Sequence, residues 1–149
     1  MIQRKQSLYL LISAIILLLT GMTPFFTFDA DTLTTMTGWA FENAHNEVVT
    51  RPWGVALFFL LGAVLAIFAI FRYKDRKRQL FLVNYQILLI FVGYVAIIAY
   101  GLAFASHYQA EMTWKAGLIV PLIAGTFSFL AHRGIRHDEE LVKAADRIR

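Results

Sequence analysis

The chain has 149 residues, of which 58% are apolar and 16% are charged, and its formal net charge at pH 7 is +4. Soluble domains carry about 45–50% apolar and about 25% charged residues, so this chain has too few charges to cover its apolar residues in water. Aromatic residues make up 15% of the chain, which excludes disorder, and the absence of cysteine excludes disulfides, thiolate nucleophiles and iron–sulfur clusters.

Four charge-free stretches organise the chain, and a helix of about 20 residues crosses a hydrocarbon core. Lipid offers no partners to backbone N–H and C=O groups, so each stretch is predicted to be a helix. The predicted spans are residues 7–27, 53–72, 80–105 and 114–131. The first is expected to stay uncleaved, because the run is too long for a secretory signal and no small-residue cleavage site follows it. These spans predict an all-α integral membrane four-helix bundle, a single domain over residues 1–149.

The outer loop, residues 28–52, leaves two interpretations open. The run Thr32–Thr37 and Gly38 indicate a turn or short strand, so a small cap on the bundle is one of them. The favoured interpretation is a spacer whose aromatic residues dip into the membrane interface. Five side chains of metal-ligand type lie on the outer side, but their spacing requires no site and no metal is predicted; they are Glu42, His45, Glu47, His107 and Glu111.

The positions of Lys and Arg predict the orientation. Twelve of the fourteen lie in the amino-terminal segment, in the basic inner loop 73–79 with the adjoining Arg72, and in the tail 132–149. Both termini are therefore expected in the cytoplasm. The basic residues are expected to contact anionic lipid headgroups or a cytoplasmic partner, and not nucleic acid; they are Arg72, Lys74, Arg76, Lys77, Arg78, Arg133, Arg136 and Arg147.

Small residues within the spans are expected to let helices approach closely. They are Gly62, Ala66, Gly93, Gly101 and Gly125. Their pattern does not separate packing within the bundle from packing against another membrane protein. Pro121 is expected to kink the fourth helix.

Polar side chains in the third span are expected to join helices by hydrogen bonds. Asn84 and Gln86 lie two positions apart, about 200° around a helix, so they cannot both face one partner. Tyr94 and Tyr100 need partners for their hydroxyls. The candidates are backbone carbonyls or the hydroxyls of Ser13, Thr20 and Ser128.

The tail 132–149 is predicted to form a short cytoplasmic helix, with acidic residues first and basic residues last, an order that suits the helix dipole. Leu141, Ala145 and Ile148 share one face. The tail either continues the fourth helix or rests on lipid or a partner, and Gly134 is the expected place for a break.

The two ends of the chain also carry a resemblance. The motifs are Met1-Ile2-Gln3-Arg4 with Gln6, Leu8, Tyr9 and Leu10 at the start, and Leu130-Ala131-His132-Arg133, Asp138-Glu139-Glu140-Leu141-Val142 and Asp146-Arg147-Ile148-Arg149 at the end. They resemble those of a Bacteroidota four-helix inner-membrane family, domain of unknown function 4293. The resemblance implies a small inner-membrane protein with a cytoplasmic contact, and it implies no activity.

Chemistry-bearing motifs are absent from the sequence: it has no G-x-S-x-G, P-loop, H-E-x-x-H or G-x-G-x-x-G, and no charged side chain near mid-membrane. An enzyme is therefore not predicted, and no catalytic residue or cofactor is assigned. The function expected is a non-catalytic accessory or scaffolding subunit of a larger inner-membrane complex, with another membrane protein as partner. The alternative is a lipid- or small-molecule-binding module with a pocket near Tyr94 and Tyr100, and a transporter component is less favoured.

Overall fold

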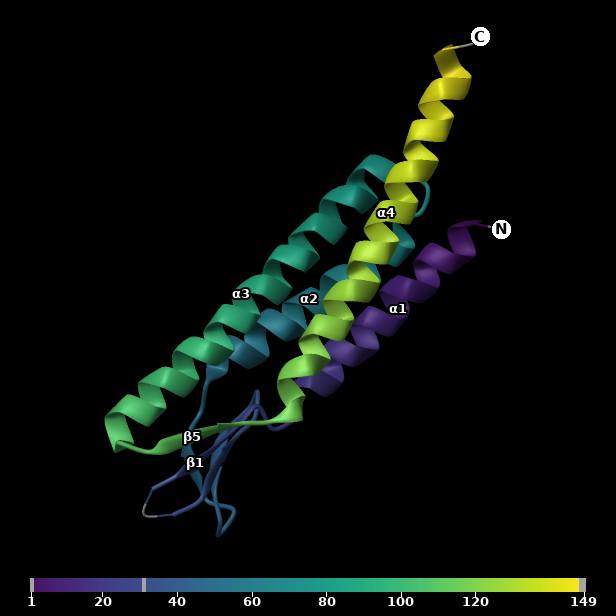
Figure 1. Ribbon diagram of the computed structural model, residues 1–149. Coiled ribbons are helices and arrows are strands. Elements are labelled where there is room, and N and C mark those ends of the chain that lie inside the picture. Colours follow the sequence, from purple (N-terminus) through teal and green to yellow (C-terminus); the bar gives the residue numbers. More distant parts are fainter. Residues whose placement is uncertain (1, 31, 148–149) are drawn as a thin grey trace.

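The computed structural model describes residues 2–30 and 32–147. Within them the chain forms four α-helices, which are α1 (Ile2–Thr20), α2 (Trp53–Phe71), α3 (Arg76–Tyr108) and α4 (Ile119–Arg147). Figure 1 shows the helices bundled together, with a group of strands at one end and with the start of α1 and the finish of α4 toward the other. We refer to these as the sheet end and the terminal end.

The helices pack in an up-and-down order. α1 lies between α2 and α4, and α3 contacts both α2 and α4. Within the described residues three helices are long and apolar enough to cross a membrane, namely Trp53–Phe71, Arg76–Tyr108 and the helical stretch Ala116–Ala144. α1 adds a shorter apolar stretch, Lys5–Thr20. These helices indicate a multi-pass membrane protein.

The all-α prediction is wrong at the sheet end, where five short strands form one antiparallel sheet in the order β4-β3-β2-β1-β5. The strands are β1 (Phe26–Asp29), β2 (Thr34–Met36), β3 (Phe41–Asn43), β4 (Val48–Thr50) and β5 (Glu111–Trp114). The favoured interpretation of residues 28–52 as a spacer is also wrong, because these residues build most of a structured cap.

The cap is held by an aromatic face turned toward the bundle. In β1 the buried Phe26 and Phe28 alternate with more exposed residues, which is the period of a half-buried strand. The Phe41 ring stacks on Phe104 of α3 with 4.4 Å between ring centroids. β5 pairs with β1 in a register that places Trp114 beside Phe26. The connection between α3 and α4 is thereby fastened to the segment that follows α1.

α1 ends at Thr20 and not at residue 27 as predicted, because its apolar run continues beyond the helix into a buried strand. The Gly38 N–H donates to the Gly21 carbonyl at 3.0 Å. A Cβ at Gly21 would stand 2.6 Å from the Trp39 indole nitrogen. The first residue after α1 is therefore a glycine because the cap lies directly against it.

The second predicted span agrees with α2 to one residue, whereas α3 extends beyond 80–105 at both ends. The Asp75 side chain accepts a hydrogen bond from the Arg78 N–H and caps the start of α3. The added turns of α3 place its basic first residues beyond the apolar part of the bundle.

α4 departs from the prediction at both ends. It begins at Ile119 and not at 114, because β5 and a short 3₁₀ turn, Ala116–Leu118, come first. Pro121 consequently lies in the first turn, where a missing N–H is tolerated, and not at a mid-helix kink. α4 then continues to Arg147 without a break at Gly134, so the tail is not a separate short helix. Gly134 packs on α1, since a Cβ there would stand 3.1 Å from Gln6 Cγ.

Candidate functional site

The inside of the bundle contains a hydrogen-bonded cluster that joins three helices. The Gln86 amide nitrogen on α3 donates to Ser13 Oγ on α1 and to Ser128 Oγ on α4, both at 2.9 Å. Each serine Oγ also lies 3.0 Å from the Ala124 carbonyl, to which it donates. All three side chains are fully buried, and the Gln86 carbonyl oxygen has no partner among the described residues. The arrangement fastens helices and offers no opening for a substrate.

The other polar residues of α3 have different surroundings. Asn84 is exposed, so the 200° separation expected from Gln86 is found, with Gln86 alone pointing inward. Tyr94 is half-buried, whereas Tyr100 is 40% exposed. The two serines expected to bond the tyrosine hydroxyls instead accept from the Gln86 amide. Thr20 donates to the Ile16 carbonyl of its own helix.

Most of the predicted small residues pack inside the molecule. Ala66 is fully buried in α2. A Cβ at Gly62 would stand 3.3 Å from Leu17 Cδ1 of α1, and one at Gly93 would stand 3.0 Å from the Phe59 ring of α2. At Gly101 it would stand 2.7 Å from the Phe26 ring of the sheet. These glycines allow close approach within the fold.

Gly125 differs from the rest. A Cβ there would meet only Ile90 Cγ2, at 3.9 Å, which is ordinary contact. Gly125 lies in a groove of about 520 Å³ between α3 and α4. The residues lining this groove, called here the α3–α4 groove, are Ile87, Ile90, Phe91, Tyr94, Pro121, Leu122, Gly125, Thr126 and Phe129. The lining is almost wholly apolar, and its outer residues Phe91 and Phe129 are 67% and 59% exposed.

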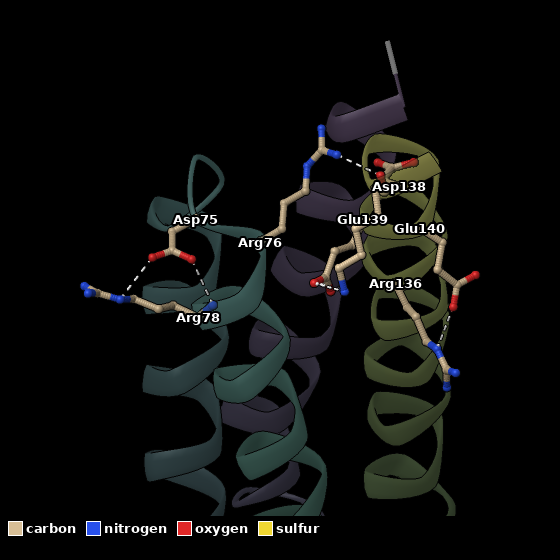
Figure 2. A network of polar contacts seen from close by, with 8 residues as sticks. Asp75, Arg76, Arg78, Arg136, Asp138, Glu139 and Glu140 are labelled. Atoms are coloured by element: carbon tan, nitrogen blue, oxygen red, sulfur yellow. Dashed lines mark hydrogen bonds and ion pairs between the residues drawn. The ribbon is translucent and has the colours of Figure 1, made fainter. Parts of the chain in front are cut away.

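The terminal end carries a second polar assembly, and Figure 2 shows the part of it around Arg76 and Asp138 from close by. Gln6 Nε2 donates to the buried Asp138 carboxylate at 2.6 Å. Arg76 Nη1, at the start of α3, donates to the Asp138 carbonyl at 2.8 Å. Asp138 therefore joins α4 to both α1 and α3. Sequence patterns did not reveal this junction, because Gln6 reads as part of an apolar run and Asp138 as part of an exposed acidic one.

Beside this junction lies a hollow of about 790 Å³, called here the basic hollow. It is lined by Tyr73, Lys74, Asp75, Arg76, Lys77, Glu139, Val142 and Lys143. Lys143 Nζ lies 2.7 Å from Glu139 Oε1. This hydrogen bond lowers the pKa of the Glu139 carboxyl. Burial opposes it, and the charges of Lys143, Lys77 and Arg76 add to the lowering. Glu139 is thus held as a carboxylate within a basic surrounding.

The structure divides the predicted basic residues into two groups. Lys74, Arg76 and Lys77 line the basic hollow. The others lie outside it: Arg72 follows α2, Arg78 pairs with Asp75 at 3.0 Å, Arg133 is exposed, and Arg136 pairs with Glu140 at 3.1 Å. Arg147 closes α4, and its side chain lies outside the described part of the structure.

The metal-type side chains of the sheet end are not assembled into a site. Among residues 2–30 and 32–147 no three His, Asp or Glu side chains come together as metal ligands would. The three tryptophans of the chain lie at the sheet end, and each is half exposed or more; they are Trp39, Trp53 and Trp114.

A comparison with protein families gives a match over nearly the whole chain. The family model described as "Domain of unknown function (DUF4293)" matches residues 2–148. A comparison with curated proteins gives no match. The matched residues include both polar assemblies, the α3–α4 groove and the basic hollow.

Proposed function

The chain belongs to the DUF4293 family, whose description assigns no activity, and from this premise and its geometry we propose that it is a non-catalytic accessory or scaffolding subunit of a larger membrane complex. In this proposal a transmembrane helix of the partner protein packs into the α3–α4 groove. The chain lies in a bacterial inner membrane, with the terminal end in the cytoplasm and the sheet end outside.

The observation that carries the proposal is the contrast between Gly125 and the other small residues. Gly62, Gly93 and Gly101 are filled by side chains of the same molecule, whereas Gly125 faces an open groove. In lipid there is no hydrophobic drive between helices, so association depends on close packing at small residues. Gly125 and Pro121 have short side chains or none, whereas the exposed rings of Phe91 and Phe129 project beside them in the same groove. This shape suits a helix better than a flat apolar face would.

The charge distribution supports the proposed orientation. The terminal end bears the basic connection around Lys74 and the basic residues of α4, while the sheet end bears Arg51, Lys115 and the three tryptophans. Positive residues favour the cytoplasmic side, and tryptophan favours an interface where its ring meets both lipid and water.

Site-specific photocrosslinking in native membranes tests the proposed function. A photoreactive residue placed at Phe91, or in a second variant at Phe129, should crosslink to a second membrane protein. The crosslinked products from the two positions should have the same mass. A residue at Phe68 of α2, which is 58% exposed away from the groove, is the matched control and should not give that product. Gly125→Phe should abolish the product by filling the groove, and Gly125→Ala should keep it. Equal products from Phe68, or products with lipid alone, would contradict the proposal.

A second candidate function is supported by the size of the same groove. Its volume of about 520 Å³ lies in the range of small-molecule sites, roughly 300–1,000 Å³. The Tyr94 side chain contributes the one ring hydroxyl of the lining. A lipid- or small-molecule-binding module would retain an apolar ligand in native mass spectrometry, and Gly125→Phe would release it without any loss of a protein partner.

A further inference from the structure

We propose that the basic hollow at the terminal end is a binding site for the phosphate-bearing headgroup of an anionic phospholipid. The inference does not depend on the α3–α4 groove, and it holds whether or not a partner helix occupies that groove. It rests on the shape, the charge and the surroundings of the hollow.

The shape comes from two segments far apart in the sequence. The connection from α2 to α3 supplies Tyr73 and Lys74, and the first turn of α3 supplies Lys77. Glu139 and Lys143 come from α4. The Arg76 bond to the Asp138 carbonyl holds these two walls together at one edge. Figure 2 shows this bond beside the Glu139 side chain and its ion pair, between the start of α3 and α4. The hollow is therefore part of the packed structure and does not depend on a loop closing.

The charge of the hollow is positive after its internal pairs are counted. Glu139 is paired with Lys143, and Asp75 is paired with Arg78. Among the described residues, neither Lys74 nor Lys77 has a carboxylate within ion-pair distance, and both are exposed. Arg76 uses one guanidinium nitrogen on a neutral carbonyl and keeps its charge. Two lysines and this arginine are thus available to an anion.

The surroundings favour a lipid over a free phosphate or an acidic protein. Phe71, the last residue of α2, is 73% exposed and lies two positions before Tyr73 of the lining. Tyr73 is 48% exposed and Val142 is 46% exposed. The hollow consequently borders apolar surface at the level where the apolar helices end. A phospholipid uses both features, because its phosphate meets the lysines while its chains follow the apolar surface. A water-soluble anion uses only the first.

Native mass spectrometry of the purified full-length protein in mild detergent tests the inference. Phosphatidylglycerol and phosphatidylcholine with identical chains are the probes, and the wild-type protein should retain the anionic lipid in preference. The double variant Lys74→Gln/Lys77→Gln should weaken its retention by about tenfold or more, since each basic residue near an anionic surface contributes severalfold to affinity. The matched control Arg133→Gln/Arg136→Gln removes two charges from the same end outside the hollow and should change retention by less than about twofold.

Four outcomes would overturn the inference. One is equal retention of the two lipids by the wild-type protein, and a second is equal weakening by both double variants, which would indicate overall charge alone. A third is competition by soluble glycerol phosphate at the same concentration as the lipid, which would indicate a site for free phosphate. A fourth is displacement of the lipid by an acidic peptide at that concentration, which would indicate a protein-docking surface. The thermal unfolding midpoint of each variant without lipid verifies that folding is unchanged.

Discussion

Gln6 and Asp138 lie 132 positions apart in the sequence, yet Gln6 Nε2 donates a hydrogen bond of 2.6 Å to the Asp138 carboxylate. The two residues belong to the two end motifs on which the family resemblance rested. Both side chains are buried, with 6% and 7% of their surface exposed. The end motifs therefore meet in one structural unit, where α1 fastens the far part of α4.

Removing this bond should destabilise the protein. Gln6→Ala leaves the Asp138 carboxylate buried without its amide donor, and a hydrogen bond to a charged group contributes about 1.5–3 kcal/mol. The expected result is a lower free energy of unfolding by that amount, measured by thermal or denaturant unfolding in detergent. Glu140→Gln is the control, because its pair with Arg136 is exposed and contributes about 0–1 kcal/mol. An equal effect of the two substitutions on the free energy of unfolding would show that the buried Gln6–Asp138 bond stabilises the fold no more than the exposed pair does.

In the hydrogen-bonded cluster around Gln86, removing the glutamine amide should lower the stability less than removing its two serine partners. Gln86→Leu removes the amide together with its unpartnered carbonyl oxygen, and both serines keep their bonds to the Ala124 carbonyl. We expect a change within about 1 kcal/mol, because the serine hydroxyls keep their acceptor, and the large cost arises when a buried donor or acceptor loses its partner. The double variant Ser13→Ala/Ser128→Ala strips the buried amide of its partners and should cost about 1–3 kcal/mol. A larger loss of unfolding free energy in Gln86→Leu than in the double serine variant would contradict the hydrogen bonds assigned to Gln86.

Gly117 in the 3₁₀ turn and Gly125 in α4 should differ in how substitution by alanine changes the stability of the protein. A Cβ at Gly117 would clash with the Pro24 carbonyl oxygen, a backbone atom that cannot rotate away. Gly117→Ala should therefore destabilise by about 1–3 kcal/mol, the usual cost of overpacking. The Cβ of Gly125→Ala makes only an ordinary contact with Ile90 and should leave the unfolding midpoint unchanged or raise it slightly. Equal responses would show that Gly117 does not hold the connection between α1 and β1.

The cap should loosen separately from the helices. Phe41→Ala removes a buried ring that stacks on Phe104, and such a truncation costs about 3–5 kcal/mol. Hydrogen exchange followed by mass spectrometry should show faster exchange in residues 34–50 with little change in α2. Val48→Ala, in an edge strand and 46% exposed, is the control and should leave exchange unaltered. Faster exchange throughout the bundle would mean that the cap and helices form one cooperative unit.

Hydropathy located the helices but not their ends. The run before Arg72 predicted α2 to within one residue, because charged and proline residues bound it on both sides. The run from Gln6 to Phe28 is equally free of charge, yet it contains a helix, a turn and a strand. Apolar character reports that a segment avoids water and not which backbone conformation it takes. Gly21 and Pro24 were the signals for the change.

The sequence by itself determined the apolar lengths, the charge asymmetry and the opposite placement of Asn84 and Gln86. Only the tertiary structure decided that Gln86 points inward, that Gly125 faces an open groove while Gly101 is filled by Phe26, and that Gln6 meets Asp138. The physical reason is that lipid is as apolar as the interior of the bundle, so an apolar pattern does not distinguish a buried helix face from a lipid-facing one. Which face is buried depends on the shapes of neighbouring helices, and those shapes meet only in the folded chain.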